Sequence, residues 1–167
     1  MTTNRLDRVF IFGDQLSFLI PHEWVESDDE GKNYLYHAPN ADSGWLRVSL
    51  ISIKKGCFPK DLRSLLNERA LSENGRLYDS GNNIVVAWEK KSHEDGNPII
   101  NFWWAAVGQY HEPTLSHEVM ISFTVMADRE KDAQTIETVA LLTQLVAKSE
   151  LRSSKPVWSA VCSTMKI

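Results

Sequence analysis

Two segments in the second half of the chain have the clearest strand pattern. Residues 99–108 and 118–126 are dense in β-branched and aromatic side chains, and turn residues bound them. An amphipathic segment that fits a helix follows at residues 129–149, with Asp128 as its expected cap. The predicted buried stripe of this helix consists of Ala133, Ile136, Val139, Ala140, Thr143 and Val146, and Leu141 and Leu145 widen it. Because strands and helices bury their apolar sides against one another, this order predicts a layered α+β domain.

The first half of the chain repeats this order in weaker form. Strand candidates occupy residues 9–12, 16–20, 33–38 and 45–54, each bounded by Gly or Pro or by a turn cluster. The acidic run at residues 26–30 is interpreted as a solvated turn between two of these strands. Pro59-Lys60-Asp61 opens a helix in which Leu62, Leu65, Leu66 and Ala70 share one stripe, and Asn74-Gly75 ends it.

Three strands then come in succession, at residues 84–91, 99–108 and 118–126. The dipeptides Asp95-Gly96 and Asn97-Pro98 favour a tight turn, so the simplest topology is an antiparallel meander. We expect a single domain over residues 1–167, with a core at about 9–149 and a tail at 153–167 that is apolar enough to dock.

Composition narrows the classes of function. The chain has 167 residues, enough for one domain with a sizeable core, and its formal charge is −4. A negative charge repels nucleic-acid phosphates, so binding to DNA or RNA is disfavoured. Only two cysteines occur, Cys57 and Cys162, which are interpreted as reduced thiols. No apolar run has the length of a membrane span, and the N-terminus lacks a signal-peptide pattern. A soluble cytoplasmic protein is expected.

Residues 16–24 form an alternating strand followed by Pro21 and Trp24. This opening, and the order of elements over residues 9–149, resembles the PsbP-like fold family. That family includes the P subunit of photosystem II, a nuclear-import protein that binds the GTPase Ran, and bacterial DcrB-type proteins. The resemblance implies an α-β-α sandwich on an antiparallel sheet and a protein that acts by docking on another macromolecule. It carries no functional residue over to this chain.

Reactive constellations are not apparent in the sequence. His111-Glu112 and His117-Glu118 flank one loop, but they lack the fixed spacing that helps a metal site form. The acidic run at residues 26–30 lacks the ligand pattern of a calcium loop, and no glycine-rich phosphate motif is present. Cys57 has no identifiable histidine partner. We therefore predict no catalytic residue, no metal, no cofactor and no enzymatic activity.

Aromatic residues are the most informative candidates for binding, because the chain contains six Trp residues. Consecutive strand residues face opposite sides of a sheet, so Trp103 and Trp104 cannot enter the same layer. One interpretation buries both sheet faces under helices, with Ile100, Phe102, Trp104 and Ala106 in one layer and Ile99, Trp103, Ala105 and Val107 in the other. The alternative leaves one face partly open beside Trp45 or Trp104.

The leading functional hypothesis is a non-catalytic protein-binding module, of adaptor, chaperone or immunity type, that uses Trp45, Trp104 or Trp158. A second hypothesis is a small enzyme or ligand receptor with a sheet pocket lined by Tyr34, Tyr36, Trp88 and a histidine. A third is an obligate homodimer in which the tail around Trp158 crosses to a neighbour. The pattern of residues leaves the choice between monomer and homodimer open.

Overall fold

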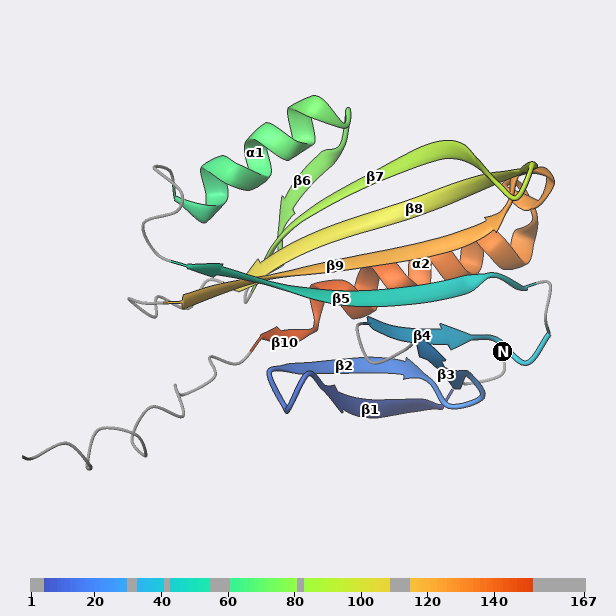
Figure 1. Cartoon of the computed structure of the whole chain (residues 1–167), viewed down its shortest axis with the longest axis horizontal. Helices are drawn as coiled ribbons and strands as arrows, with labels where there is room; N and C mark the ends of the chain where they lie inside the picture. Colours follow the sequence, from blue (N-terminus) through green and yellow to red (C-terminus); the bar gives the residue numbers. More distant parts are fainter. Residues whose placement is uncertain are drawn as a thin grey trace, which may run out of the picture.

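We analysed a computed structural model of the chain. It describes residues 5–29, 33–40, 43–54, 61–80, 83–108 and 115–151, and the predicted docked tail at 153–167 lies outside these residues. Within the described part, strands form two antiparallel sheets, and two α-helices accompany them (Figure 1).

The larger sheet has seven strands in the order β3-β4-β5-β9-β8-β7-β6. Their bounds are β3 (Val25–Asp29), β4 (Asn33–His37), β5 (Trp45–Lys54), β6 (Arg76–Asp79), β7 (Asn83–Glu94), β8 (Asn97–Gly108) and β9 (Leu115–Met126). The predicted meander is confirmed, since β7, β8 and β9 pair antiparallel in chain order. A tight turn joins β7 to β8, in which Asp95 has φ 50° and Gly96 has φ 80°. This conformation suits the Asp-Gly dipeptide.

The smaller sheet has three strands in the order β1-β2-β10. These are β1 (Leu6–Ile11), β2 (Leu16–Pro21) and the short β10 (Glu150–Leu151), all antiparallel. The helices are α1 (Leu62–Ser72) and α2 (Ala133–Ala147), and a single 3-10 turn, η2 (Ala127–Arg129), follows β9. Asp61 caps α1 as its position predicts, because its carboxylate accepts a hydrogen bond from the Ser64 backbone N–H at 2.8 Å.

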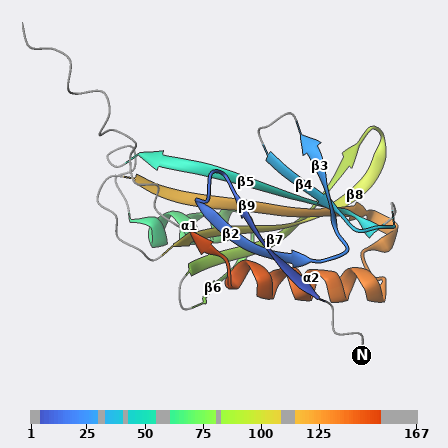
Figure 2. The same cartoon turned by 90° about the horizontal axis from the view of Figure 1, so that it is seen from below.

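The two helices pack on opposite faces of the larger sheet. Ile100, Trp104 and Ala106 of β8 belong to the same buried cluster as Leu142 and Leu145 of α2. Their chain neighbours Ala105 and Val107 belong to a second cluster with Leu66 of α1. This distribution confirms that alternate residues of β8 enter two different layers, as the strand period requires. Figure 2 shows α2 running along one side of the long strands.

The smaller sheet shares the layer of α2. Leu16 and Phe18 of β2 are buried in the cluster that also holds Leu142, Leu145 and Val146 of α2. The larger of the two clusters therefore lies between the seven-stranded sheet on one side and α2 with the β1-β2-β10 sheet on the other. The molecule is an α+β protein of antiparallel sheets with two helices, and because it is mostly sheet, a complete α-β-α sandwich stays a prediction.

Three sequence expectations are wrong in detail. The acidic run is not a turn: residues 25–29 form β3, which pairs with β4 at the sheet edge. Charged residues suit an edge strand because they oppose unwanted pairing with other chains. Asp128 does not cap the long helix, since it lies in η2 and α2 starts at Ala133 after Asp132. The strand β6 was not predicted at all.

The buried stripe of α2 agrees with the predicted one only in part, at Leu145 and Val146. Its buried residues are Thr135, Leu142, Leu145 and Val146, whereas Ile136 is 56% exposed. Apolar residues occupy most positions of this helix, so two neighbouring stripes both fit helical spacing. The packing partners, β2 and β8, decide between them.

Candidate functional site

The face of the larger sheet opposite to α2 is only partly covered. Leu62, Leu66 and Ala70 of α1 pack over Ile84 and Val86 of β7 at one end of this face. We call the remainder, beyond α1, the open face. Cross-strand pairing places its residues in rows, one of which contains His37, Trp45, Thr124, Asn101 and Lys90, and the next Leu35, Arg47, Ser122, Trp103 and Trp88.

Several exposed apolar side chains lie on the open face. Of the eight exposed large hydrophobic side chains in the described part, four lie there: Val25, Trp45, Ile51 and Met126. Trp45, the first residue of β5, is 46% exposed. Soluble proteins seldom leave contiguous apolar surface exposed without a use for it, so this face is a candidate interaction surface.

Neighbouring side chains hold Trp45 and the other open-face tryptophans in place. The His37 ring lies beside Trp45, with ring centroids 5.3 Å apart. In the adjacent row, Trp88 and Trp103 stack with centroids 5.9 Å apart and planes 8° from parallel. The Arg69 guanidinium carbon lies 5.8 Å from the centroid of Trp88. These contacts present aromatic surface in fixed orientations, which reduces the entropy lost on binding.

A hydrogen-bonded ladder runs through the row that contains Trp45. Thr124 Oγ1 donates to Asn101 Oδ1 at 2.6 Å, and Asn101 Nδ2 donates to Ser92 Oγ at 3.1 Å. Lys90 and Arg47 are the charged side chains of the two rows, and neither row contains a carboxylate. These two rows thus combine apolar, hydrogen-bonding and basic groups, although the chain as a whole carries a charge of −4.

The boundary of the open face is set by an ion pair beneath α1. Arg69 Nη2 lies 3.1 Å from Oε1 of Glu118, whose side chain is almost completely buried on β9. Burial raises the pKa of the Glu118 carboxyl above its ordinary value, and the Arg69 charge acts in the opposite direction. The pair attaches α1 to β9, while α1 packs mainly against β7 and β6.

The structure separates the tryptophans that the sequence proposed together. Trp45 is on the open face, whereas Trp104 faces α2, is 2% exposed, and donates a hydrogen bond from Nε1 to Thr143 Oγ1 at 3.1 Å. Trp104 therefore contributes to the core and offers no accessible surface. Trp158 lies outside the described residues.

The ligand pocket expected from Tyr34, Tyr36 and Trp88 does not form. Both tyrosines face the larger cluster on the α2 side, and Tyr36 is buried there, whereas Trp88 packs against the cluster on the α1 side. The two sets of side chains are on opposite faces of one sheet. Burial raises the pKa of Tyr36 well above its ordinary value, which makes it a poor proton donor.

Histidines do not assemble into a site within the described part. His22 Nδ1 lies 2.6 Å from Asp7 Oδ2 at the surface, while His37 is beside Trp45 and His93 is exposed near the β7–β8 turn. Among the residues whose side chains are described, no group of three or more His, Cys, Asp or Glu is placed to hold a metal ion. His111, Cys57 and Cys162, and the His117 side chain, lie outside that part.

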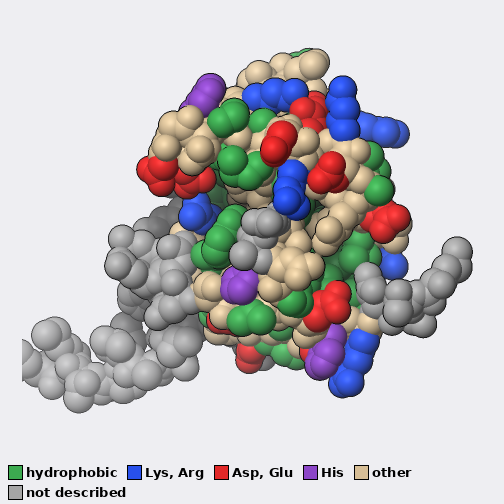
Figure 3. Space-filling view, turned by 90° about the vertical axis from the view of Figure 1, so that its right-hand side faces the viewer, with side chains coloured by type: hydrophobic (Ala, Val, Ile, Leu, Met, Phe, Trp, Pro, Cys, Tyr) green, Lys and Arg blue, Asp and Glu red, His purple; other side chains and the backbone are tan. Residues whose placement is uncertain are grey.

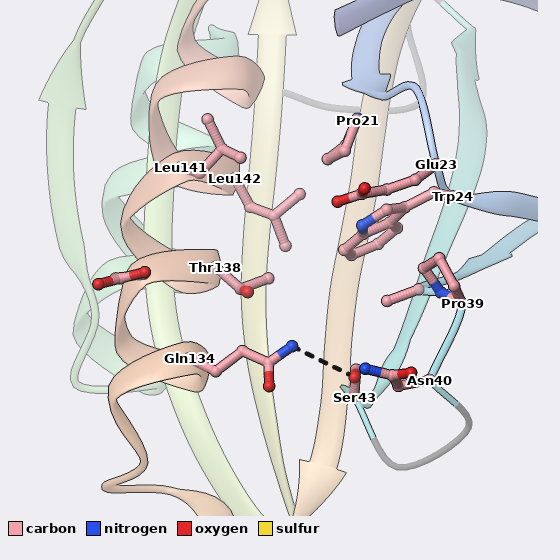
Figure 4. A pocket seen from close by; sticks show the side chains of 12 residues that line it. Pro21, Glu23, Trp24, Pro39, Asn40, Ser43, Gln134, Thr138, Leu141 and Leu142 are labelled. Carbon is pink, nitrogen blue, oxygen red and sulfur yellow. Dashed lines mark hydrogen bonds between the residues drawn. The ribbon is translucent and has the colours of Figure 1, made fainter. Parts of the chain in front are cut away.

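A pocket of about 520 Å³ lies between α2 and the segments that follow β2 and β4 (Figure 4). Its residues come from three parts of the chain: Pro21, Glu23, Trp24, Ala38, Pro39, Asn40, Ser43, Gln134, Glu137, Thr138, Leu141 and Leu142. Gln134 Nε2 donates to Ser43 Oγ at 3.3 Å across one end. Trp24 is set against the core through its contact with Phe123, 6.0 Å between ring centroids.

Gly44 fixes the loop that forms one wall of this pocket. Its φ is 94°, and a Cβ there would lie 2.7 Å from the Thr124 carbonyl oxygen and from the Phe123 ring. Only glycine allows this close approach to β9.

Seen from the end that carries the β7–β8 turn, the surface bears interspersed acidic and basic side chains with hydrophobic ones between them (Figure 3). Among the described residues, no helix has the length and apolarity needed to cross a bilayer.

Comparisons with solved structures identify the fold. A protein of Bacteroides thetaiotaomicron superposes with a TM-score of 0.60 at 20% identity, over 88% of this chain and 48% of that one. The chain thus spans about half the length of the Bacteroides protein. LpqN of Mycobacterium tuberculosis, described as involved in cell envelope biogenesis, gives a TM-score of 0.55 at 10% identity, over 90% of this chain and 93% of that one.

The chain has a PsbP-like fold. The Ran-binding protein Mog1p of Saccharomyces cerevisiae is a further match, with a TM-score of 0.49 at 10% identity, over 89% of this chain and 96% of that one. No protein-family model matches the chain, and a search of the curated proteins gives no match either. The superpositions on the Bacteroides protein and on LpqN confirm the PsbP-like fold that the opening strand, Pro21 and Trp24 suggested.

The pocket beside α2 is the feature of this PsbP-like domain that sequence reasoning missed. Trp24 was noticed only as part of the family resemblance, and Gln134 and Ser43 were not considered. The signal in the sequence is weak, because the lining residues extend from Pro21 to Leu142 and none forms a local motif. Only the packing of α2 beside β2 brings them together.

Proposed function

We propose that this protein is a non-catalytic binding module that contacts a polypeptide partner through its open face, with Trp45 at the centre of the contact. The observation that carries the proposal is that Val25, Trp45 and Met126 lie towards one end of an uncovered sheet face, with Ile51 exposed further along β5. Burial of such side chains against a partner is the main source of affinity in protein interfaces.

The chemistry of the open face favours a polypeptide over a small molecule. Interface centres are enriched in Trp and Arg, and the two open-face rows contain Trp45, Trp88, Trp103 and Arg47. Small ligands bind mostly in concave pockets, and the pocket described here lies beside α2 instead. The basic residues Lys90 and Arg47 fit a partner surface that is apolar with acidic groups at its rim.

The proposal leaves the biological role open among an adaptor, a chaperone and an immunity-type protein. We place the interaction in the cytoplasm, a reducing compartment in which the two cysteines would stay as thiols. The fold itself carries no argument for a particular partner, since one fold supports many functions. The partner must therefore be found through the open face.

The test compares Trp45→Ala with Leu71→Ala, a matched control on α1 whose side chain is 84% exposed and points away from the sheet. Proteins retained by the wild type from extracts of the source organism are identified, and the retained polypeptide is purified for titration calorimetry. Loss of a central tryptophan should weaken binding about tenfold or more, and the control should bind like the wild type.

Two results would count against this function. Equal binding by both variants would remove the open face from the contact. A solution mass of twice 19.0 kDa that Trp45→Ala halves would show that a second copy of the chain, instead of a different partner, occupies the face. Circular dichroism melts of both variants confirm that the exposed substitutions leave the fold intact, with changes of about 1 kcal/mol or less.

A further inference from the structure

We propose that the pocket beside α2 binds a cationic group, an ammonium or guanidinium carried on an apolar stem. This inference is independent of the proposed function, because the pocket lies on the α2 side of the sheet and shares no lining residue with the open face. The argument rests on which charges line the pocket, on the position of Trp24 and on its size.

The lining residues carry negative charge and no positive charge. Glu23 and Glu137 are both on the list of lining residues, and neither Lys nor Arg is among them. Figure 4 shows the Glu23 side chain directed into the pocket beside the Trp24 ring, with Leu142 and Thr138 on the facing side. Both glutamates are solvent-exposed, and a cation in the pocket would meet their counter-charge, whereas an anion would meet like charge.

Trp24 adds a second interaction that is specific for cations. A cation over the face of a tryptophan within about 6 Å of the ring is attracted by the ring quadrupole, and Trp is the most favourable of the aromatic residues for this contact. The ring cannot turn freely, because it packs on Phe123 at the core. The carboxylate of Glu23 and the face of Trp24 therefore act on the same space.

The apolar and polar walls match a stem and its substituents. Leu141, Leu142 and Pro21 supply apolar surface, while Gln134 and Ser43 close one end with a hydrogen bond between them. A volume of about 520 Å³ lies within the range of small-ligand pockets, about 300–1,000 Å³. An alkyl chain ending in an ammonium or guanidinium group fits this arrangement. Such a group is supplied either by a free amine or by a Lys or Arg side chain of a polypeptide.

The experiment titrates the whole chain, labelled with ¹⁵N, with four probes and follows backbone amide shifts. Agmatine represents the free amine, and the peptide acetyl-Gly-Gly-Arg-Gly-Gly-amide represents the side chain. Hexanoate is the anionic control, and 1-pentanol is the neutral control. We expect saturable shifts at Trp24, Gln134 and Leu142 with at least one cationic probe, at a dissociation constant of about 1 mM or lower, and none with hexanoate.

The variants locate the interaction. Glu23→Gln keeps the shape of the pocket and removes one charge, so binding of the cationic probe should weaken about three- to tenfold. Glu89→Gln makes the same charge change on β7, outside the pocket, and should bind like the wild type. Tighter binding of agmatine identifies a free amine as the ligand, and tighter binding of the peptide identifies a side chain.

Three outcomes would overturn the proposal: no saturable response to either cationic probe, binding of hexanoate or 1-pentanol as tight as that of agmatine, or equal weakening by Glu23→Gln and Glu89→Gln. Because no variant touches the open face, failure here leaves the proposed polypeptide contact untouched.

Discussion

At the scale of single residues, the ion pair between Arg69 and Glu118 lies at the border between the covered part of the sheet and the open face. The Glu118 carboxylate is buried under α1 and depends on Arg69 for its counter-charge, with Nη2 and Oε1 3.1 Å apart. Arg69 in turn lies over the Trp88 ring, at the border of the open face. One ion pair thus links the position of α1 to the aromatic rows beside it. A buried pair of this kind is costly to break, since one charge is left without its partner.

The pH dependence of stability should reveal the Glu118 carboxyl. Burial raises its pKa in the folded protein above the ordinary value of 4.5, so the folded state binds this proton more tightly than the unfolded state. This contribution to the free energy of unfolding is present at low pH and is lost as the pH rises through the raised pKa. Glu118→Gln lacks it, so the stability of this variant relative to the wild type should increase as the pH rises above 4.5.

Urea unfolding of both proteins at several pH values measures this difference, and a difference that stays constant or changes in the opposite direction would contradict the assignment.

Arg69→Met provides the complementary test because it keeps the apolar stem over the sheet. It should cost about 2–4 kcal/mol at neutral pH. The cost should be smaller at about pH 4, where Glu118 is protonated in the variant.

At the scale of elements, regular patterns predicted the structure well and packing choices were not predictable. The strands β7, β8 and β9 are found where dense β-branched and aromatic runs and an Asp-Gly turn placed them. The stripe of α2 was predicted only in part because its apolar residues fit two stripes, and contacts with β2 and β8 select one. The sequence also singled out Trp45 and Trp104 equally. They differ only in whether other elements cover their side of the sheet, which the sequence pattern does not reveal.

Gly44 is the element-scale position at which a backbone conformation and a close contact coincide. With φ at 94° and a Cβ that would lie 2.7 Å from the Thr124 carbonyl oxygen, Gly44→Ala should destabilise the protein by about 2–4 kcal/mol. Gly96 in the β7–β8 turn is a matched control, because its φ is 80° and no atom lies within 4 Å of a Cβ there. Gly96→Ala should cost about 1 kcal/mol through backbone strain alone.

Chemical denaturation of the two glycine variants gives the comparison. Equal losses would mean that the contact with β9 adds nothing beyond the strained backbone. A larger loss for Gly44→Ala should come with amide shift changes at Ser43 and Gln134, since the same loop forms a wall of the pocket beside α2.

At the scale of the whole molecule, the two faces of the larger sheet differ in how they are used. One face is buried against α2 and the smaller sheet, and it holds the larger hydrophobic cluster. The other is covered by α1 at one end and carries Trp45 in the open at the other. Stability requires the first face, whereas nothing in the core requires an exposed tryptophan on the second. This asymmetry is the physical basis for the proposed role of the open face in binding.

The most direct test of this account is photo-crosslinking from the open face in cells of the source organism. A benzophenone amino acid placed at position 45 should give an adduct with one distinct polypeptide, and purified wild-type protein should compete it away while Trp45→Ala protein should not. The same amino acid at position 71 should give no such adduct. The same adducts from both positions, or an adduct at position 45 with only a second copy of the chain, would contradict the account.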